Sequence, residues 1–521
     1  MRVLTKEEMY AADRYAIETI GMPEELLMEN AAQALLHAMK PRLAQIQSGA
    51  KELQTVILAG TGNNGGDGIA LARQMQAEGF AVRLLLVPEP GQLTGAAAAH
   101  LAFYQKAGYS LLSLSDLSEE AAVQAVEEAI QAADVIVDAL LGIGMHGQPR
   151  GFYADVIRLI NNAPRALVFA IDLPSGVAAD QANVSLAVCA DVTLTIQCPK
   201  PSAFLYPARS FYGEVEIVEI GIPPKAIEST GCRCMLWGQA ELRNTLSHRA
   251  PDSHKGDYGR AVLVGGSREM PGAITMAAKG CLRGGCGLLT VVLPDCIQAM
   301  AAAHMTEAMY HLEPAPEGHF SGEISIPEGD AYAIGPGMGR FPETREVLEQ
   351  MLLIDAPLVI DADALYYLEA GSDLWTLVRR RKALTVLTPH TGEMARLCGC
   401  SVQTVHMDRF GYAAALAKES GAVVVLKGPF TLTAFPDGRV YVNTSGNPGL
   451  AKGGSGDLLA GMILGFLGKS GNVTAAVCNA VYAHGAAADD LINSGMAENS
   501  LLAGDILAQI PKTVCRLMDD R

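Results

Sequence analysis

The chain has 521 residues, of which half are hydrophobic, 18% charged and 6% aromatic, and its formal net charge is −17. At roughly 150 residues or more per domain this length suggests two or three domains, and the apolar content excludes disorder as the main state. The acidic balance argues against nucleic acid or an anionic membrane as the main partner, but backbone N–H groups can still bind a phosphorylated ligand.

The cysteines and the amino-terminal segment predict a cytoplasmic protein. The 11 cysteines include no CxxC pair, and the closest spacings, Cys232/Cys234 and Cys398/Cys400, match no zinc template. We expect no disulfide framework at this length, and therefore a reducing compartment. The segment MRVLTKEEMYAADRY lacks the apolar core of a signal peptide, and the apolar run Leu458–Leu467 is shorter than the ~20 residues that span a bilayer.

Apolar, β-branched runs alternate with helical patterns in the first half of the chain. Such runs indicate a parallel sheet covered by helices on both faces, with ligands bound at the carboxyl ends of the strands. Glycine and aspartate gather at those ends, which explains much of why the 54 glycines exceed the usual ~7% of a chain. The expected strands are Thr55–Gly60, Ala81–Pro88, Asp134–Leu141, Ala166–Asp172, Val192–Gln197 and Val215–Ile220.

A glycine-rich loop, Thr61–Gly68, follows the first strand and precedes a helical pattern. This order is typical of a phosphate site, because glycines let the backbone approach an anion at the start of a helix. The loop is neither GxGxxG nor a P-loop. A tight turn with Asp67 near the helix start is the plainer alternative, but two asparagines beside four glycines favour a ligand site.

Two aspartates end later strands of the same predicted sheet. Asp138 ends DVIVD and precedes a second glycine-rich loop, Gly142–Gln148, while Asp172 ends ALVFAID and precedes LPSG. Either aspartate alone is equally consistent with a helix cap or a turn. Together with two loops at the same sheet edge, they favour an active site.

The motifs GNNGGDG, DALLGIG, AIDLPSG and MENAA (Met28–Ala32) resemble those of the NAD(P)H-hydrate epimerase domain, over roughly residues 1–220. The resemblance implies that Asp172 faces the hydrated nicotinamide ring and that Asn64, Asp138 and Ser175 bind potassium. Tyr153 lines the pocket or a core edge. The implied substrate-binding residues, which hold the phosphates, are Asn63, Asn64, Gly65, Gly66, Asp67, Gly142, Ile143, Gly144, Met145, His146, Gly147 and Gln148.

Epimerisation of a carbinolamine carbon requires transient loss of its configuration, by ring opening or by departure of hydroxide. A carboxylate such as that of Asp172 can accept and return the proton and can stabilise an iminium cation. The residues leave both routes open.

A break with two prolines, Gly221–Cys234, is interpreted as a linker between two α/β domains. A turn signal, FPDG, then separates the last two of the strand-like runs beyond it. Those runs are Arg260–Gly265, Leu288–Leu293, Ala331–Gly335, Pro357–Asp361, Leu384–Leu387, Ala422–Lys427, Thr431–Ala434 and Arg439–Asn443.

A second glycine-rich segment, Asn447–Asp457, precedes a long apolar helical run. The N–H groups at that helix start can cradle a transferring phosphoryl group, and Asp457 is placed to take a proton from an attacking hydroxyl. An aspartate chosen only for capping is the plainer alternative, but GGSGD before such a helix is a sharper signal.

The second half resembles the ribokinase-like superfamily through GSGD. Within it, HKGDYGR, MPGA, GPGMG, TPHTGE, LKGPFT and NPGLAKGGSGD are similar to the nucleotide-dependent NAD(P)H-hydrate dehydratase, over about 230–515. The resemblance implies that Asp457 acts on the C6 hydroxyl and that Glu393 organises Mg²⁺ through water. His390 stands where kinases of the superfamily commonly carry asparagine. The implied hydrate-binding residues are Ala273, Gly337, Gly339, His390 and Asp457, and the implied nucleotide-binding residues are Lys427, Gly428, Pro429, Phe430, Thr431 and Gly456.

These resemblances imply an α/β protein of two three-layer αβα domains. Residues 1–222 form a Rossmann-like epimerase domain, and residues 230–518 form a ribokinase-like dehydratase domain. The implied substrates are NADH-hydrate, NADPH-hydrate and ADP, or ATP in its place, with K⁺ and Mg²⁺ as cofactors and AMP and phosphate as products. We expect a homo-oligomer that binds neither nucleic acid nor membranes. The alternatives are a small-molecule kinase with a regulatory amino-terminal domain, a first domain that is only a scaffold, and a Rossmann dehydrogenase, for which no GxGxxG is present.

Overall fold

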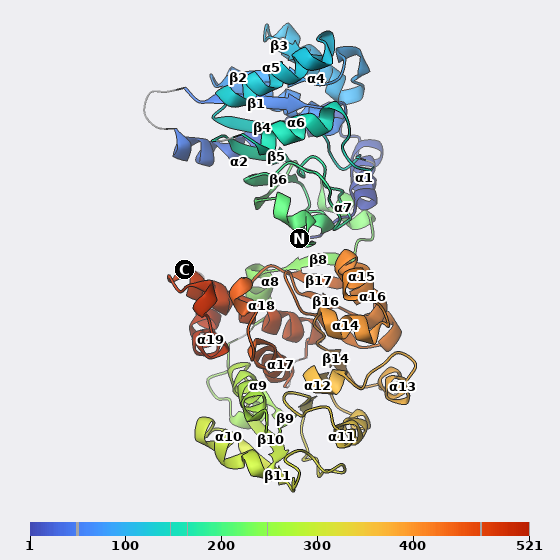
Figure 1. The fold of residues 1–521 in the computed structure, drawn as a ribbon, viewed down its shortest axis with the longest axis vertical. Helices are drawn as coiled ribbons and strands as arrows, with labels where there is room; N and C mark the ends of the chain where they lie inside the picture. The colour runs from blue at the N-terminus through green and yellow to red at the C-terminus, as the bar shows by residue number, and fades with distance from the viewer. Residues whose placement is uncertain (48–51, 146, 164, 247, 469–470, 520–521) are drawn as a thin grey trace. The chain divides into compact units, whose positions relative to one another are not determined.

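The computed structural model describes residues 1–521 except 48–51, 146, 164, 247, 469–470 and 520–521. It divides into two compact units, Met1–Cys232 and Arg233–Arg521 (Figure 1). Each unit is built around its own β-sheet. Among the described residues, no helix has both the length and the apolar character needed to cross a membrane.

The described strands of the first unit form one parallel sheet in the order β3-β2-β1-β4-β5-β6-β7. The six predicted strands are confirmed, and β3 joins the edge as a strand too short to show a pattern. Because parallel strands share one direction, the carboxyl ends of β1, β4, β5 and β6 meet at one edge of the sheet. The bounds are β1 Gln54–Ala59, β2 Ala81–Leu86, β3 Leu111–Ser113, β4 Val135–Ala139, β5 Leu167–Ile171, β6 Val192–Ile196 and β7 Glu214–Val218.

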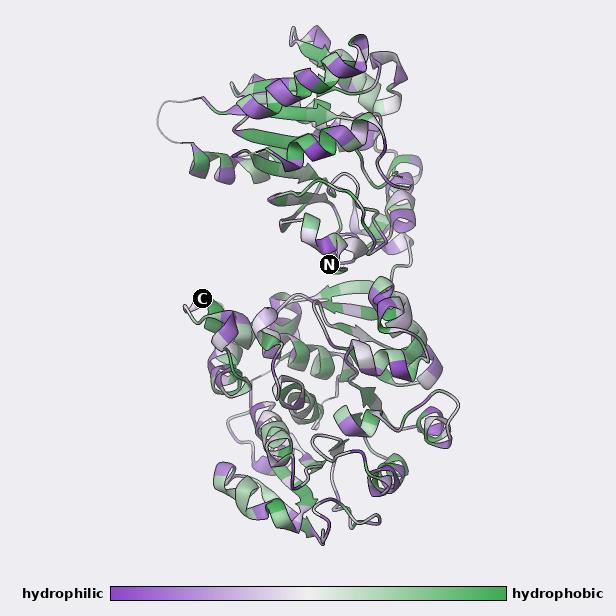
Figure 2. Ribbon diagram, in the orientation of Figure 1, coloured by the Kyte–Doolittle hydropathy of each residue, from purple (hydrophilic) through white to green (hydrophobic). Residues whose placement is uncertain are grey.

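Helices cover both faces of this sheet, because successive strand residues point to opposite sides. Ile57 of β1 packs into a core shared with α2, α3 and α4, while its neighbour Leu58 packs into a second core with α5 and α6. Figure 2 shows the result as hydrophobic strands inside helices whose outer surfaces are hydrophilic. The helices are α1 Lys6–Arg14, α2 Glu24–Ile46, α3 Asn63–Ala77, α4 Gly95–Lys106, α5 Glu119–Ala132, α6 Phe152–Asn161 and α7 Pro224–Ser229.

The sheet of the second unit has the order β11-β10-β9-β12-β13-β14-β15-β16-β17-β8. Only β16 runs antiparallel to its neighbours within the described sheet, as the FPDG hairpin signal predicts. The eight predicted strands are confirmed, and β8 and β11 were not anticipated. The bounds are β8 Cys234–Trp237, β9 Arg260–Val264, β10 Leu288–Pro294, β11 Met309–Glu313, β12 Ala331–Ile334, β13 Leu358–Ile360, β14 Thr385–Leu387, β15 Val423–Leu426, β16 Leu432–Ala434 and β17 Val440–Asn443.

One face of this second sheet packs into a large core with α9, α17, α18 and α19, while α11, α13 and α16 contact one another on the other side (Figure 1). The pattern confirms the expected α/β fold class. The bounds are α8 Gln239–Thr245, α9 Pro271–Arg283, α10 Gln298–His304, α11 Pro342–Leu352, α12 Ala362–Leu365, α13 Asp373–Arg380, α14 Thr391–Leu397, α15 Val402–Met407, α16 Arg409–Ser420, α17 Ser455–Leu467, α18 Val473–Asn493 and α19 Ala503–Met518.

Helices α9 and α17 meet backbone to backbone. A Cβ atom at Gly461 would lie 1.8 Å from the carbonyl oxygen of Ala277, and one at Gly465 would lie 2.2 Å from that of Cys281. The glycines of the apolar run LLAGMILGF are therefore packing residues, and they seat the helix that carries Asp457 at its start.

The segment Gly221–Cys234 differs from the expected linker. Pro223 and Pro224 begin helix α7, since a proline at the first helical position loses no hydrogen bond, and Ala226 and Ile227 of that helix are buried. The thiol of Cys232 donates to the carbonyl of Val3, 3.1 Å away, and β8 begins at Cys234. The segment is thus structured up to the division between the two units.

Candidate active sites

The first candidate site begins where β1 leads into α3. Because α3 starts at Asn63, its first backbone N–H groups have no acceptor within the helix, and the positive end of the helix dipole lies there. Gly62 precedes the helix and offers no side chain to these groups, and nothing lies within 4 Å of a Cβ atom placed on it. A phosphate can therefore approach this helix end, as the loop predicts.

Close packing accounts for other glycines of this loop. A Cβ atom at Gly65 would lie 2.0 Å from the carbonyl oxygen of Gly60, so α3 could not follow β1 this tightly with any side chain there. A Cβ atom at Gly66 would lie 2.6 Å from the methyl group of Met28, which belongs to the MENAA segment. Gly65 and Gly66 thus shape the loop from within the fold.

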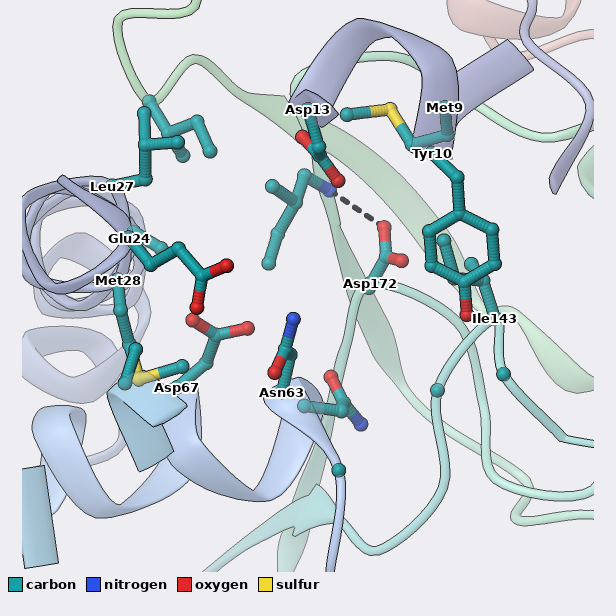
Figure 3. A pocket seen from close by; sticks show the side chains of 18 of the residues that line it. Met9, Tyr10, Asp13, Glu24, Leu27, Met28, Asn63, Asp67, Ile143 and Asp172 are labelled. Atoms are coloured by element: carbon teal, nitrogen blue, oxygen red, sulfur yellow. Dashed lines mark hydrogen bonds between the residues drawn. The ribbon is translucent and has the colours of Figure 1, made fainter. Parts of the chain in front are cut away.

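A cavity of about 510 Å³ opens at this sheet edge (Figure 3). It brings together several predicted residues from the two loops and from the end of β5. Helices α1 and α2 and the segment after β6 complete its wall with side chains that the sequence motifs did not indicate. The predicted lining residues are Asn63, Asn64, Asp67, Gly142, Ile143, Gly144, Met145 and Asp172, and the unpredicted polar ones include Tyr10, Asp13, Glu24 and Lys200.

Asp172 forms an ion pair with Lys200, and the lysine side chain is only 1% exposed. The same carboxylate oxygen accepts a hydrogen bond from the backbone N–H of Ile196 at 3.0 Å. Asp172 has a φ angle of +67°, which is unusual for a residue with a side chain. The bend turns the chain at the end of β5 and holds the carboxylate against Lys200.

Further carboxyl groups share the cavity with this pair. Burial raises the pKa of Asp13 to about 6, an effect that Lys200 reduces and Asp172 increases. Burial also raises the pKa of Asp67 well above its usual value, and the charges of Asp172 and Asp13 add to the rise. Figure 3 shows the side chains of Asp13, Glu24 and Asp67 directed into the cavity. Burial and the neighbouring carboxylates therefore favour the protonated form of Asp67 over the charged form.

Asn64, Asp138 and Ser175 lie beside one another at the ends of α3, β4 and β5. The Ser175 hydroxyl donates to Asp138 Oδ1 at 2.6 Å, and the Asn64 side-chain amide donates to the carbonyl of Leu141 at 3.0 Å. The Asn64 oxygen Oδ1 is buried without a hydrogen-bond partner. Burial raises the pKa of Asp138 to about 6, although Ser175 donates to both of its oxygens.

The remaining predicted residues of the first site lie outside the cavity lining. Gly147 and Gln148 are exposed beyond it, and Tyr153 is a partly buried residue of α6 whose pKa is raised by burial. His146 lies outside the described residues.

The second candidate site is centred on Asp457 in the first turn of α17. Burial raises the pKa of Asp457 to about 6, and the charge of Asp361 contributes to the rise. Lys427, just beyond β15, donates to Asp361 Oδ1 at 2.8 Å, and its Nζ atom lies 3.5 Å from the place of a Cβ atom on Gly456. An ammonium group therefore stands beside the glycine that starts the predicted anion hole.

Sequence reasoning treated Asp361 only as a strand end. The structure makes it the anchor of Lys427: its side chain is 2% exposed and also accepts from the Thr388 hydroxyl at 2.7 Å. Burial alone would lower the pKa of Lys427, but the charges of Asp361 and Glu393 outweigh it and the pKa is raised. Lys427 therefore stays charged beside the anion hole.

His390 and Glu393 form a capping arrangement at the start of α14. The His390 ring accepts the backbone N–H groups of Gly392 and Glu393 on Nδ1, at 2.9 and 3.2 Å, while Glu393 Oε2 accepts the backbone N–H of His390. These bonds place the proton of the neutral ring on Nε2. Burial raises the pKa of Glu393 to about 7 and lowers that of His390.

The other predicted residues of the second unit lie on neighbouring loops. A Cβ atom on Gly337 would lie 2.9 Å from that of Ala273, which places the two predicted hydrate-binding residues side by side. The Gly339 N–H donates to Asp363 at 2.9 Å, and a cavity of about 230 Å³ joins His390 and Glu393 to Arg340 and Tyr366, which were not predicted. Lys427–Thr431 forms one loop, in which Thr431 donates to the carbonyl of Gly428.

The fold and these two sites define an α/β enzyme with a separate site in each unit. A family profile described as NAD(P)H-hydrate dehydratase matches residues 261–512, and one described as YjeF-related protein N-terminus matches residues 24–202. The chain is 37% identical to the bifunctional NAD(P)H-hydrate repair enzyme of Moorella thermoacetica, covering 100% of this chain and 98% of that one. It is 31% identical to the enzyme of the same name from Escherichia coli, covering 98% of this chain and 93% of the other.

Among solved structures, the ADP/ATP-dependent NAD(P)H-hydrate dehydratase from Bacillus subtilis, co-crystallised with ATP and Mg²⁺, covers 54% of this chain and 98% of its own. Its sequence identity is 35% and its TM-score 0.50. The chain belongs to the family of bifunctional NAD(P)H-hydrate repair enzymes. Both resemblances inferred from the sequence are thereby confirmed.

Proposed function

We propose that the first unit epimerises the R and S forms of NADH- and NADPH-hydrate, and that the second dehydrates the S form with ADP or ATP as phosphoryl donor. The observation that carries this assignment is that each unit has its own helix start open to phosphate and its own carboxylate at the carboxyl edge of its own sheet. With ADP, the products are NAD(P)H, AMP and phosphate.

In the first unit, Asp172 is the acid/base residue. Its ion pair with Lys200 orients the carboxylate in the cavity, where it can accept the hydroxyl proton of the hydrate as the bond between C6 and the ring nitrogen breaks. When the nitrogen closes the ring on either face of C6, the carboxyl group returns the proton to the oxygen. The same negative charge stabilises an iminium cation if hydroxide departs. The N–H groups at the start of α3 and the loop Gly142–Met145 receive the phosphates.

Potassium fits the cluster of Asn64, Asp138 and Ser175. The Asn64 Oδ1 atom is buried and lacks a hydrogen-bond donor, and amide, hydroxyl and carboxylate oxygens are the ligands that hard cations prefer. When bound, the ion supplies positive charge at a sheet edge that otherwise holds several carboxyl groups.

In the second unit, Asp457 takes the proton of the C6 hydroxyl as that oxygen attacks the terminal phosphoryl group of the nucleotide. Hydroxide is a poor leaving group and phosphate a good one, so this transfer lets the lone pair of the ring nitrogen expel phosphate. The backbone N–H groups in the first turn of α17, which contains Gly456, and the ammonium group of Lys427 stabilise the transferring group.

Glu393 fits a magnesium ion held through water. One carboxylate oxygen is occupied by the backbone N–H of His390, while the other has the His390 ring 3.5 Å away and is left for water. When bound, Mg²⁺ supplies charge neutralisation at the phosphates. Because Nδ1 of His390 accepts backbone N–H groups, its Nε2–H, which lies 3.5 Å from Glu393 Oε1, is the group that would donate to the hydrate.

The test is a recovery assay on the purified full chain with mixed epimers of NADH-hydrate, K⁺ and Mg²⁺. With ADP or ATP present, we expect the absorbance of the reduced nicotinamide to recover for both epimers. Recovery of only one epimer would remove the epimerase assignment. A stable phosphorylated product would instead support a small-molecule kinase, and no recovery with either nucleotide would remove the dehydratase assignment.

We propose a cytoplasmic location. Cys281 and Cys286 are thiols in the structure although their sulfur atoms lie 3.3 Å apart, and a reducing compartment keeps such thiols reduced. A homo-oligomer stays a prediction, which light scattering of the purified protein can check.

A further inference from the structure

Arg409, the first residue of α16, is a buried arginine in a place that disfavours a positive charge. Arg409 is only 4% exposed, and its guanidinium forms no ion pair with a carboxylate within the described part of the chain. The adjacent Asp408 is exposed and its carboxylate instead accepts the backbone N–H of Gly411 at 2.9 Å. A cation at a helix start also opposes the helix dipole.

These surroundings make Arg409 unfavourable for the stability of the fold. An unpaired buried charge destabilises a fold, and burial lowers the pKa of Arg409 to about 10. Its Nε atom is buried without a hydrogen-bond partner. A neutral side chain of similar length would avoid these costs, so the charge and the planar guanidinium must serve something else.

The hydrogen bonds of Arg409 show what it holds. One terminal nitrogen donates to the carbonyl of Pro429, and the other donates to the carbonyl of Leu426 at 3.3 Å. Those carbonyls lie on either side of Lys427 and Gly428. The guanidinium therefore binds both ends of the bend that follows β15. Only a planar, forked donor can make both contacts at once.

The loop Lys427–Thr431, which Arg409 binds, has an unfavourable backbone conformation. Gly428 has a φ angle of +142° and Phe430 one of +50°, a value that costs energy for a residue with a side chain. The loop carries Lys427, whose ammonium group stands beside Gly456 and pairs with Asp361. The shape of the bend therefore decides where the charge of Lys427 lies relative to the anion hole.

We propose that Arg409 is a positioning residue for the nucleotide: it holds Lys427–Thr431 in the shape that binds the diphosphate of ADP. The inference rests on the proposed role of this loop in nucleotide binding. Arg409 itself touches neither substrate in this assignment, and it acts through the carbonyls of Leu426 and Pro429. Its effect should therefore fall on nucleotide binding and on the phosphoryl transfer that Lys427 supports, and not on binding of the hydrate.

The test compares Arg409→Met and Arg409→Lys in the full chain, with the epimerase activity of the same molecule as an internal measure of intact protein. We expect Arg409→Met to raise KM for ADP about tenfold or more, as loss of charged hydrogen bonds to a binding loop does, with KM for the hydrate changed less than about threefold. Arg409→Lys keeps the charge but not the fork, and should recover only part of the affinity.

Arg381 offers a matched control. It is also partly buried, and its guanidinium donates to backbone carbonyls, those of Met351, Leu352, Ile354 and Ala356. These carbonyls lie ahead of β13, at the sheet edge opposite to the candidate site. Arg381→Met should lower the unfolding temperature while leaving KM for ADP unchanged.

A variant on the loop side covers the case in which Arg409→Met does not fold. A Cβ atom on Gly428 would lie 3.1 Å from the Arg409 guanidinium. Gly428→Ala should therefore disturb the hydrogen bonds of Arg409 to the loop and raise KM for ADP. The inference would be overturned if Arg409→Lys and Gly428→Ala both had the wild-type KM for ADP. It would also be overturned if Arg381→Met raised KM for ADP as much as Arg409→Met does. Failure of the wild-type chain to use ADP would overturn the proposed function instead.

Discussion

Two aspartates carry the proposed chemistry, and the charged groups around them differ. Asp172 has a buried lysine in direct contact, whereas Asp457 makes no ion pair with any described residue. Burial and the charge of Asp361 raise the pKa of Asp457, and the more distant charge of Lys427 reduces that rise. Substitution therefore disturbs the two sites differently. Removing the carboxylate of Asp172 leaves the buried charge of Lys200 without its ion-pair partner. Removing that of Asp457 instead relieves its electrostatic repulsion with Asp361.

Asp172→Asn should stop epimerisation and spare dehydration. Asparagine tolerates the positive φ and keeps an oxygen that can accept a hydrogen bond from Lys200, an acceptor that alanine would remove. Either change removes the charge that Lys200 pairs with, at a cost of about 3–5 kcal/mol. With this variant, mixed epimers plus ADP should stall once the S form is consumed, apart from slow spontaneous epimerisation. Rapid conversion of the R form would exclude Asp172 as the acid/base residue.

The dehydration rate should fall as the pH is lowered through about 6. A general base must be deprotonated, and burial together with Asp361 raises the pKa of Asp457 to about 6, so the active fraction is lost below that pH. The measurement is kcat/KM for the S epimer against pH. Asp457→Asn is the matched variant: it should lose at least ~100-fold in kcat at every pH and keep full epimerase activity. A wild-type profile that stays flat through pH 6 would contradict the role of Asp457.

At the scale of elements, the contact between α9 and α17 sets the position of Asp457. Gly461→Ala would place a methyl group 1.8 Å from the carbonyl oxygen of Ala277, so the helices must separate, at a cost of about 1–3 kcal/mol. Both tryptophans of the chain, Trp237 and Trp375, lie in the second unit, so tryptophan fluorescence during denaturation reports on that unit.

Gly504→Ala is the control for this substitution. Gly504 lies in the first turn of α19 with nothing within 4 Å of its Cβ position, so alanine there should be neutral or stabilising by up to about 1 kcal/mol. We expect Gly461→Ala to lower both the midpoint of denaturation and the dehydratase rate. Equal midpoints for the two variants would show that the glycine contact does not hold α17 in place.

The predicted strands were found because a strand buried on both faces of a parallel sheet is a continuous apolar run, as β1 and β15 are. The edge strand β11 mixes Tyr310 and His311 with apolar residues, and β3 has three residues, so neither shows such a run. Two prolines without an apolar period predict a linker, but a proline can equally start a helix, as Pro224 does in α7.

Part of each site was predictable and part was not. Asp172 and Asp457 sit in glycine-rich motifs whose local geometry is encoded within a few residues. Lys200, Asp13 and Asp361 reach their sites through packing of distant segments, and nothing in their immediate neighbours marks that contact. Ion pairs and desolvation depend on tertiary structure, and so do the raised pKa values.

At the scale of the whole molecule, the division between the units lies at Cys232. The Cys232 thiol donates to the carbonyl of Val3 and its own carbonyl accepts from Arg2, so the segment after α7 belongs to the first unit. Cys234 begins β8, which pairs in parallel with β17 from Val440 onward in the second unit. A cut within Pro224–Ser229 would split α7, whereas a cut after 232 leaves every described helix and strand whole.

Fragments 1–232 and 233–521, expressed separately, should therefore each fold and keep one activity, epimerisation in the first and dehydration in the second. Each fragment has its own core, its own helix start open to phosphate and its own acid/base aspartate, so neither needs residues of the other. The measurements are circular dichroism and the recovery assay with single epimers, with the full chain as control. A fragment that is well folded but inactive, and that regains activity on mixing, would show that one site is shared between the two units and would replace the model of two independent sites.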